Sequence, residues 1–367
     1  MKYFIVVGER SGDLHGANLI TQIKLLDPKG EIYAWGGQQM NDAGATILED
    51  YKSINFIGLS EVLSNLLHVS KKLRLCMQQL EQFKPDCLIL IDSPGFNLRI
   101  AAYARKLGIK TSYYISPKIW AWNKSRIKKI KESVDQMMVI LPFEKKFYSE
   151  ESMDVEYVGN PILDALNNYK PDQDFLGKYN PQQTIAVLPG SRSSEVKSAV
   201  KVIQELVVVF EEIKFLVAAV DNVNERLYKP LLSHDNIEIV KGKTYDVLKA
   251  SSAAVVTSGT ATLEAALLGI PQVVVYKTSL LTYVAAKLLL KVPYISLVNL
   301  IAGHRVVTEL IQGDYDSANV VAELESLLTD EGTKKRISEG YSEIRKVLGD
   351  ESASKNAAEI IYKLCSS

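Results

Sequence analysis

The sequence predicts an α/β protein of two doubly wound, Rossmann-like lobes that face a cleft. Strand-like apolar runs alternate with helical patterns along the 367 residues, which is typical of βαβ units and parallel sheets. The alternation is interrupted once, between Tyr157 and Asn180, where Asn, Pro, Asp and Gln cluster. Because each half begins with a strand and ends in helices, we expect a domain boundary at this interruption.

The expected strands are short apolar runs next to turn residues, and the chain closes with helical patterns. The strands are Tyr3–Val7, Cys87–Ile91, Thr111–Ile115, Gln136–Ile140, Thr184–Leu188, Lys214–Ala219, Ala253–Thr257 and Gln272–Tyr276. The closing helices are Ser317–Leu328, Gly332–Leu348 and Ser352–Leu364. We therefore expect an N-terminal lobe in residues 1–165, a C-terminal lobe in 166–345, and a last helix in 346–367 that packs back on the first lobe.

Charge and cysteine content exclude several classes of function. Lys plus Arg and Asp plus Glu both number 43, so no overall field draws the protein to nucleic acid, and any anion site is local. The three cysteines form no CxxC pair and the four histidines lie far apart, which indicates no metal site and a reduced, cytoplasmic compartment. We expect neither a metal nor a cofactor.

No segment has the pattern of an export signal or a membrane span. The apolar run at the N-terminus turns acidic at once and is read as a strand. The most apolar long stretch, Ser279–Ile301, is interrupted by Lys287, Lys291 and Pro293, whereas a span needs roughly 20 uninterrupted apolar residues.

The turn after the first strand carries two acids. Gly8–Gly16 lacks the glycine spacing of a dinucleotide site, and the carboxylates of Glu9 and Asp13 would repel a pyrophosphate there. This loop suits a hydroxyl-bearing ligand, so both acids are candidate bases. Alternatively, Asp13 and Ser11 cap a helix.

A second turn follows the apolar run Cys87–Ile91 and begins with Asp92. Its carboxylate would stand at the carboxyl end of a strand, where a general base would face the cleft. The alternative is an Asx turn in which Asp92 bonds the backbone.

The C-terminal half contains two strand–turn–helix segments that could bind an anion. In the first, backbone amides at Gly190 and Ser191 and the guanidinium of Arg192 converge. Glu195, one turn later, either contacts substrate or only caps that helix.

The second of these segments follows the run Ala253–Thr257. Its small residues let backbone amides approach a phosphate at a helix start, and Glu264 lies within reach of a ribose hydroxyl. The alternative is a Ser-capped helix without a ligand. The residues of this segment are Ser258, Gly259, Thr260, Ala261 and Thr262.

Two further patterns combine apolar and basic residues. Leu59–Leu80 has helical periodicity with Lys71, Lys72 and Arg74 beside it, which fits either a helix lying in a membrane surface or a core-facing helix with a basic end. A basic run after Trp120 and Trp122 could face a membrane or phosphate, or be a solvated face: Lys124, Arg126, Lys128, Lys129 and Lys131.

The pair Asp314 and Asp316 fits the D-x-D pattern of metal-dependent sugar transfer. We interpret Asp316 instead as a helix cap, since a helical pattern follows it.

Taken together, these motifs resemble lipid-A-disaccharide synthase, a bacterial family of inverting glycosyltransferases. The resemblance covers nearly the whole chain. The segments that carry it, in the family's order, are GERSGDLHG, DSPGFNLR, SPKIWAW, LPFE, GNP, LPGSRSSE, SGTATLE and NLIAGHRVVTELIQ.

The resemblance implies a glycosyltransferase-B fold and a defined reaction. The C-terminal lobe would bind UDP-2,3-diacylglucosamine, and the N-terminal lobe would bind 2,3-diacylglucosamine 1-phosphate and face the membrane. It also implies peripheral attachment to the inner face of the cytoplasmic membrane, and suggests a homodimer. Helix residues facing the membrane would be Val62, Leu63, Leu66 and Leu67.

The family's pattern also implies residue roles. Substrate contacts are expected from Ser11, His15 and Asn97 in the first two motifs. The nucleotide site would be lined by Arg192, Ser258–Thr262, Glu264, Asn299, Glu309 and Gln312.

In four places the chain departs from the family. Gly95 stands where many members have an acid, so the expected base moves to Asp92 or Asp13. Asn160 replaces a frequent His, while Val298 and Thr308 replace frequent prolines and change loop stiffness more than chemistry.

The expected mechanism is direct displacement. Asp92, Asp13 or Glu9 would take the proton from the acceptor's 6-hydroxyl as it attacks the anomeric carbon, while Arg192 and the helix start at Ser258 steady the departing UDP. Two alternatives remain: a UDP-sugar 2-epimerase of the same fold, and a non-catalytic two-lobe sugar-binding protein.

Overall fold

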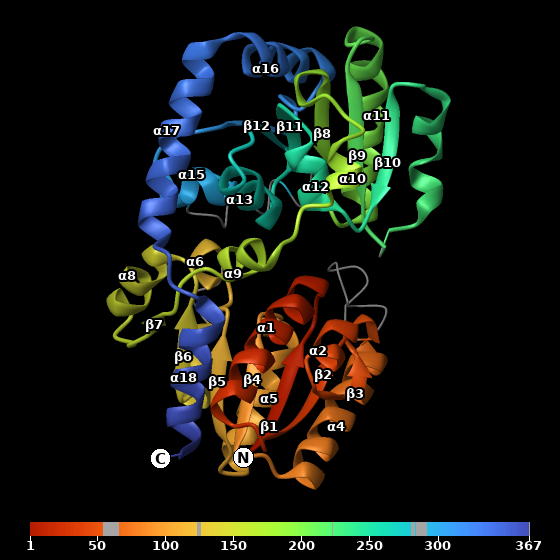
Figure 1. Cartoon of the computed structure of the whole chain (residues 1–367). Coiled ribbons are helices and arrows are strands. Elements are labelled where there is room, and N and C mark those ends of the chain that lie inside the picture. Colours follow the sequence, from red (N-terminus) through yellow and green to blue (C-terminus); the bar gives the residue numbers. More distant parts are fainter. Residues whose placement is uncertain (54–65, 123–125, 222, 280–282, 284–291, 367) are drawn as a thin grey trace. The chain divides into compact units, whose positions relative to one another are not determined.

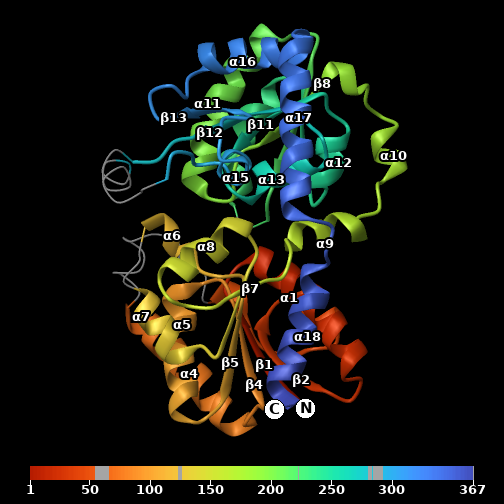
Figure 2. The same cartoon turned by 90° about the vertical axis from the view of Figure 1, so that its left-hand side faces the viewer.

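The computed structural model describes the chain except for residues 54–65, 123–125, 222, 280–282, 284–291 and 367. It divides into two compact units. The N-terminal unit comprises Met1–Asn168 with Leu348–Ser367, and the C-terminal unit comprises Tyr169–Val347. Each is a parallel sheet covered by helices on both faces (Figures 1 and 2). The predicted class, two doubly wound α/β lobes, is confirmed.

Within its described residues, the N-terminal unit has a seven-stranded sheet of order β3-β2-β1-β4-β5-β6-β7. The chain runs outward from β1 in one direction and from β4 in the other, so the strand order reverses between these two neighbours. The strands are β1 (Lys2–Val7), β2 (Glu31–Gly36), β3 (Thr46–Asp50), β4 (Cys87–Ile91), β5 (Lys110–Tyr114), β6 (Gln136–Val139) and β7 (Glu156–Tyr157).

Helices cover both faces of this sheet because its central strands are apolar on both sides. Alternate β1 residues enter different clusters: Phe4 and Val6 on one face, Ile5 and Val7 on the other. The covering elements are α1 (Arg10–Leu26), α2 (Gln38–Asp42), η1 (Tyr51–Ser53), α4 (Leu66–Phe83), α5 (Pro94–Lys106), α6 (Ile119–Trp122), α7 (Arg126–Ser133), α8 (Pro142–Glu150), α9 (Pro161–Asn168) and α18 (Ala353–Ser366).

The last helix, α18, belongs to the N-terminal unit and lies beside α1 (Figure 2). Ala357 and Ile361 are fully buried in the cluster on that face of the sheet. The Ser354 amide donates to Asp164 Oδ2 at 2.7 Å at one end, and Lys110 Nζ donates to the Leu364 carbonyl at 2.8 Å at the other. Both ends of α18 are therefore hydrogen-bonded to residues of the N-terminal unit that lie far earlier in the chain.

The C-terminal unit repeats the arrangement with a six-stranded sheet, again within the described residues, of order β10-β9-β8-β11-β12-β13. Here the strand order reverses between β8 and β11. The strands are β8 (Thr184–Leu188), β9 (Lys214–Ala219), β10 (Ile237–Lys241), β11 (Ala253–Thr257), β12 (Gln272–Tyr276) and β13 (Thr308–Ile311). The helices are α10 (Gln173–Leu176), η2 (Pro181–Gln183), α11 (Ser193–Val209), η3 (Glu225–Leu227), η4 (Lys229–Ser233), α12 (Thr244–Lys249), α13 (Thr260–Leu267), α15 (Leu297–Ala302), α16 (Ser317–Thr329) and α17 (Glu331–Leu348).

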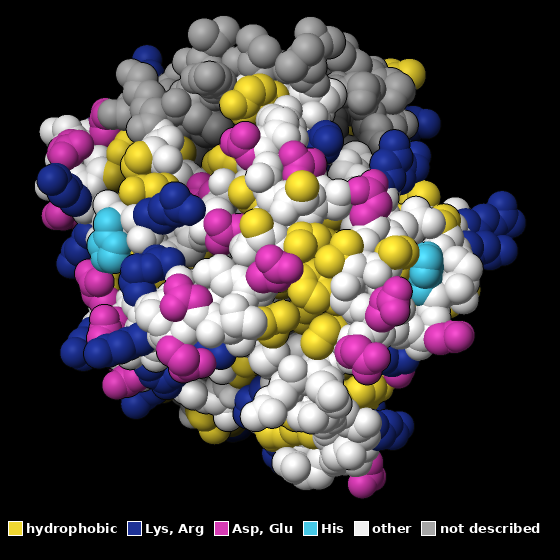
Figure 3. Space-filling model, turned by 90° about the horizontal axis from the view of Figure 1, so that it is seen from above, with side chains coloured by type: hydrophobic (Ala, Val, Ile, Leu, Met, Phe, Trp, Pro, Cys, Tyr) yellow, Lys and Arg dark blue, Asp and Glu magenta, His cyan; other side chains and the backbone are white. Residues whose placement is uncertain are grey.

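The surface mixes charges of both signs. On the face seen from above, Lys and Arg side chains lie among Asp and Glu side chains (Figure 3). An anion site on such a surface has to be built locally.

Part of the expected surface helix at 59–80 is described, as α4. Leu73, Cys76 and Leu80 are buried in the sheet's core, so this part of the helix packs inward. Of the residues expected to face a membrane, Leu67 is 82% exposed and Leu66 lies in the first turn of α4, while Val62 and Leu63 lie outside the described residues. Within the described chain, every helix is too short or too polar to cross a bilayer.

Candidate functional site

The polar groups of the N-terminal unit gather at the carboxyl ends of β1, β4, β5 and β6. Val7 pairs with Ile91, so the loop that carries Glu9 lies beside the loop that carries Asp92, where the strand order reverses. In open α/β sheets this reversal point is where ligands bind. Glu9 is exposed at the N-cap position of α1.

Asp92 and Ser93 both adopt left-handed backbone conformations, with φ of 49° and 46°. Two successive non-glycine residues in this region store strain, which persists only where neighbours hold it. Asn97 provides that hold: it is fully buried, and Nδ2 donates to the carbonyls of Asp92 at 2.8 Å and Ile91 at 3.1 Å. The Tyr113 hydroxyl also donates to the Asp92 carbonyl. Strain of this kind concentrates at functional sites.

The Asp92 side chain is suited to accept a proton. Burial raises its pKa, an effect opposed by the charge of Lys118 and by the Ser93 amide, which donates to Oδ1 at 2.8 Å. A carboxylate whose pKa lies above the ordinary value is a stronger base near neutral pH. The side chain does bond the backbone, but through the amide of the next residue, Ser93, and not through the residue two positions on that an Asx turn requires.

Asp13 has a different role from the one expected of a base. It is buried, and its oxygens accept from the amides of Gly37 at 2.7 Å, Gln39 at 3.2 Å and Met40 at 3.2 Å. The carboxylate therefore caps α2, which follows the neighbouring strand β2, rather than its own helix as the alternative proposed. Because its oxygens are engaged with three amides, the structure favours Asp92 over Asp13 as the base.

Three expected substrate contacts of this unit differ in accessibility. Ser11 is exposed in the first turn of α1. His15 is buried, which lowers its pKa to about 4, so it is neutral, and Nδ1 has no hydrogen-bond partner within the described structure. Asn97 holds the backbone of Asp92 and is closed to solvent, and its contact with substrate stays a prediction.

Sequence reasoning did not assign a role to Lys118, Trp120 or Glu144, which lie after β5 and β6. Glu144 is 1% exposed; Oε2 accepts from the amides of Leu141 at 3.0 Å and Ile140 at 3.2 Å, and Oε1 from Trp120 Nε1 at 3.0 Å. Burial raises the pKa of Glu144 to about 7, against the effect of these donors and of Lys118. Lys118 thus acts electrostatically on both Asp92 and Glu144. In the sequence Lys118, Trp120 and Glu144 lie in the segments SPKIWAW and LPFE, whose resemblance to the family could have drawn attention to them.

In the C-terminal unit, one of the protein's own carboxylates, Glu195, binds the turn after β8. Glu195 Oε2 accepts from the amides of Ser191 at 3.0 Å and Arg192 at 3.2 Å, and Oε1 pairs with Arg192 Nη1 at 2.8 Å. Gly190 has φ of 102°, and a Cβ there would lie 2.5 Å from Glu195 Oε2. Glu195 thus caps α11 through the amides of Ser191 and Arg192, which is the capping alternative stated for it, and a substrate anion at Gly190 and Ser191 stays a prediction.

The turn after β11 presents a helix start without a cap. Leu188 pairs with Val256, so this turn adjoins the one after β8, at the reversal of strand order. Gly259 is the N-cap of α13, and no described side chain caps the helix there. The alternative of a Ser258 cap is wrong, because the Ser258 hydroxyl donates to the Ile295 carbonyl at 2.9 Å.

The side chains of this turn differ in their exposure to solvent. The Thr262 hydroxyl is buried and donates to the Gly259 carbonyl at 2.8 Å, whereas Thr260 is exposed and Ala261 half-buried. The first amides of α13 therefore face the edge of the sheet where an anion would approach.

Glu309 joins Asn299 in a support for the loops at this edge. The Glu309 carboxylate accepts from the amides of Ile295 and Ser296, both at 3.0 Å, from the Ser296 hydroxyl at 2.7 Å and from Asn299 Nδ2 at 2.9 Å. Asn299 is fully buried, and Oδ1 accepts from the amide of Val306 at 2.8 Å. In this structure both side chains bind neighbouring groups of the protein, and their contact with a nucleotide stays a prediction.

Gln312 is similarly engaged. Oε1 accepts from the Thr278 amide at 2.9 Å, and Nε2 donates to the Thr278 carbonyl at 3.2 Å. Gln312 thus attaches the segment after β12 to the end of β13.

Glu264 is half-buried on α13, and Oε1 accepts from the Tyr245 hydroxyl at 3.1 Å. Burial raises the pKa of Glu264, and the Tyr245 hydroxyl opposes that shift. Its helix begins at the uncapped turn after β11, which leaves Glu264 as the carboxylate of this unit best placed for a ligand hydroxyl.

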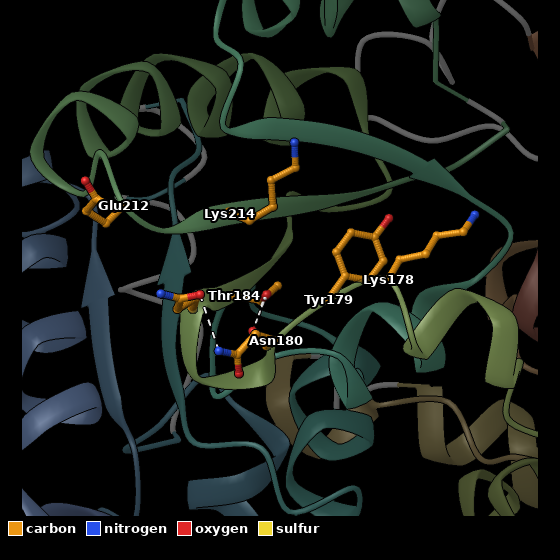
Figure 4. A pocket seen from close by; sticks show the side chains of 7 residues that line it. Lys178, Tyr179, Asn180, Thr184, Glu212 and Lys214 are labelled. Carbon is orange, nitrogen blue, oxygen red and sulfur yellow. Dashed lines mark hydrogen bonds between the residues drawn. The ribbon is translucent and has the colours of Figure 1, made fainter.

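A surface hollow of about 290 Å³ lies elsewhere in the C-terminal unit (Figure 4). Thr184 and Lys214, which line it, are the first residues of β8 and β9. It therefore lies at the amino ends of the strands, the opposite edge from the carboxyl ends where ligands bind in such sheets.

The acids of the D-x-D pattern, Asp314 and Asp316, lie at the start of α16. The described residues contain no group of three or more His, Cys, Asp and Glu side chains able to hold a metal ion. Asp316 is the N-cap of α16 and accepts from the Asn319 amide at 2.8 Å, which confirms its interpretation as a cap.

Comparison with known proteins identifies relatives along the whole chain. The family model described as lipid-A-disaccharide synthetase matches residues 3–363. The lipid-A-disaccharide synthase of Syntrophus aciditrophicus is 38% identical over 370 residues, covering 98% of this chain and 97% of the relative. That of Geobacter sulfurreducens is 35% identical, covering 99% and 97%.

Solved structures with a similar fold are more distant in sequence. The UDP-GlcNAc 2-epimerase of Neisseria meningitidis, bound to UDP-GlcNAc, aligns with a TM-score of 0.68 at 17% identity and covers 99% of both chains. The Staphylococcus aureus MnaA–UDP structure aligns with a TM-score of 0.68 at 16% identity, covering 96% of this chain and 94% of that one. At such identities the likeness is one of fold alone.

Glu144→Gln tests the buried carboxyl of the N-terminal unit. Because folding raises the pKa of Glu144 from 4.5 to about 7, the folded protein binds the extra proton in this window, and its free energy of unfolding falls as pH rises through it. At about 1.4 kcal/mol per pKa unit, the fall is about 3 kcal/mol at most. We expect this fall in the free energy of unfolding with rising pH to be missing from Glu144→Gln.

The measurement is urea unfolding at pH 5 and pH 8, followed by tryptophan fluorescence, since all three tryptophans lie in the N-terminal unit. The matched control is Glu150→Gln, an exposed acid on the same helix. Equal pH dependence in Glu144→Gln and the wild type would contradict the assignment.

Proposed function

The chain belongs to the lipid-A-disaccharide synthase family of glycosyltransferases, and on this premise we propose its substrates and the roles of its residues. The reaction transfers 2,3-diacylglucosamine from its UDP derivative to the 6-hydroxyl of 2,3-diacylglucosamine 1-phosphate and releases UDP. The observation that carries the proposal is the uncapped start of α13 at the reversal of strand order, in a chain that matches the family over nearly its whole length. The donor's diphosphate is the anion that this helix start would receive.

The C-terminal unit binds the UDP part of the donor. The first amides of α13, at Thr260 and Ala261, hold the diphosphate, and the helix dipole favours its charge. Arg192 adds a guanidinium from the adjoining turn; its five N–H donors can engage Glu195 and a phosphate together. Glu195 therefore contributes by orienting Arg192.

The remaining expected residues of the nucleotide site have two roles, contact with the ribose and support of the surrounding loops. Glu264 accepts a hydrogen bond from the ribose. Asn299, Glu309 and Gln312 hold the loops around β12 and β13 in place.

The N-terminal unit supplies the base, and Asp92 is that base. Its carboxylate takes the proton of the acceptor's 6-hydroxyl, the oxygen forms a bond to the anomeric carbon from the face opposite UDP, and the bond from that carbon to the diphosphate oxygen breaks. The raised pKa and the strained backbone of Asp92 support this choice. Glu9 is the second candidate, from the adjoining loop.

Gly95, where many relatives carry an acid, does not lack space for one. A Cβ at Gly95 would meet no atom within 4 Å. Position 95 thus has room for an acidic side chain but carries glycine, and we assign the role of base to the nearby Asp92.

Acylated substrates require contact with a membrane surface, and we place this contact at the start of α4. Leu67 is 82% exposed there, and Lys71 and Arg74 are exposed one and two turns further on. An apolar side chain beside cations suits anionic lipid. Peripheral attachment to the inner face of the cytoplasmic membrane and a homodimer remain predictions from the family.

Product analysis tests the proposed reaction. Purified protein is incubated with the acylated donor and acceptor, and we expect a tetra-acyl disaccharide and UDP in equal amounts. A parallel incubation with UDP-N-acetylglucosamine alone tests for epimerisation, which is suggested only by fold neighbours. Epimer without disaccharide would overturn the proposal, as would tight binding of free sugar with no release of UDP.

Asp92→Asn tests the base. The amide cannot accept the proton, so we expect kcat to fall by roughly 10²–10⁴ while UDP affinity is retained. The comparison variant is Asp13→Asn, which weakens the cap of α2 and is expected to lower stability by about 1 kcal/mol with a much smaller change in kcat. If Asp13→Asn were the inactive variant, the roles would be reversed.

Arg192→Ala tests the stabilisation of the leaving group. Loss of one positioned donor to a developing charge should lower kcat by roughly 10²–10³. The matched control is Arg105→Ala, which removes an exposed arginine paired with Asp135 at 2.6 Å in the N-terminal unit. Near-normal turnover of Arg192→Ala would remove this residue from the mechanism.

A further inference from the structure

Tyr245, in the C-terminal unit, lies outside the motifs identified in the sequence. It lies in the first turn of α12 and is half-buried, and its hydroxyl donates to Glu264 Oε1 at 3.1 Å. The two residues come from different helices. The contact therefore depends on how α12 and α13 are placed on the same sheet.

Within the described chain, the Tyr245 hydroxyl is the one protein donor to the Glu264 carboxylate. It engages Oε1, so Oε2 is the oxygen left for a ligand. The elements that pack most closely on α13 bring no other charge, because α15 and β11 have no titratable side chains and β12 has only Tyr276. The remaining titratable residues of α12 are Asp246 and Lys249.

Tyr245 is itself held in place by its neighbours. Its ring packs edge-on against Tyr169, with centroids 5.3 Å apart and an interplanar angle of 81°. The Tyr169 hydroxyl donates to Asp246 Oδ1, which also accepts from the Asp172 amide at 2.9 Å. Lys249 lies over the Tyr169 ring, 5.4 Å from its centroid. The other charged residues of α12 are thus engaged with Tyr169 and Asp172, and only Tyr245 reaches Glu264.

We propose that Tyr245 is a positioning residue for the donor nucleotide, whose hydroxyl holds the Glu264 carboxylate so that Oε2 accepts a hydrogen bond from the ribose. This inference rests on the proposed function, in which the C-terminal unit binds UDP. A carboxylate that is oriented before the ligand arrives does not have to be ordered on binding, so affinity rises without a new contact to the ligand. Tyr245 need not touch the nucleotide.

The test is Tyr245→Phe, which removes the hydroxyl and keeps the ring that packs on Tyr169. We expect the Kd of UDP, measured by titration calorimetry, and the KM of the donor to rise roughly tenfold, the scale of one hydrogen bond to a charged group. The acceptor KM and kcat should stay within about twofold.

The matched control is Tyr179→Phe in the same unit. It removes an equivalent hydrogen bond, from the Tyr179 hydroxyl to Glu238 Oε1 at 2.7 Å, beside the hollow at the amino ends of the strands. We expect UDP binding to be unchanged in this variant. A rise in Kd equal to that of Tyr245→Phe would show a general loss of packing and overturn the proposal.

The pH dependence of UDP binding gives a readout that a purely structural role would not move. Burial raises the pKa of Glu264 and the Tyr245 hydroxyl lowers it, so removal of the hydroxyl raises that pKa further. Since the ionised carboxylate accepts the ribose hydroxyl, affinity is lost as pH falls through this pKa. We expect the acid midpoint of UDP binding to move to higher pH in Tyr245→Phe and to stay in place in Tyr179→Phe.

A double-mutant cycle with Glu264→Gln completes the test. If Tyr245 acts through Glu264, the hydroxyl deletion has little further effect on the Kd of UDP in the Glu264→Gln background. Additive effects, or an unchanged Kd in Tyr245→Phe, would overturn the role of Tyr245 while UDP binding by the wild type still stands. Failure of the wild type to bind UDP would instead overturn the proposed function.

Discussion

The reversal of strand order next to the first strand of each sheet is the constraint on which both candidate sites depend. At β1 and β4, and again at β8 and β11, the chain leaves neighbouring strands in opposite directions, so the loops at their carboxyl ends separate and leave backbone amides at the edge. Those amides need acceptors. At the turn after β8 the acceptor is the protein's own Glu195, and at the start of α13 we propose a ligand.

Across the two units, carboxylates bind backbone amides next to several other helix starts as well. Asp13 binds the amides that start α2, Glu144 those before α8, Glu195 those before α11, and Glu309 those that precede α15. A carboxylate that accepts several amide hydrogen bonds gives rigidity to a loop but is poorly available to a substrate. The acids left for chemistry are those with fewer donors and a pKa raised by burial, Asp92 and Glu264.

The same frame is compatible with different chemistry, which explains why epimerases and this glycosyltransferase align over nearly their whole lengths at low identity. Function in such a frame is set by the side chains at particular sites. In this chain a strained Asp92 lies beside Lys118, and Tyr245 supports Glu264. Both pairs join residues from separate loops or helices, so substitution in one element alters a group held by another.

The two-lobe parallel architecture follows from the pattern of residues along the chain, because strands buried on both faces must be continuously apolar. All eight expected strands are present. The sequence pattern did not predict β2 or the four edge strands β3, β7, β10 and β13. The edge strands are short or half-exposed and so mix polar with apolar residues. The motifs also located the turns that carry Asp92, Arg192 and Glu264. The division of the acids into caps and available groups depends instead on contacts formed in the folded protein. The amides that Asp13 and Glu309 bind, and the hydroxyl that donates to Glu264, come from segments 10 to 27 residues away in the chain, so no local pattern reveals them.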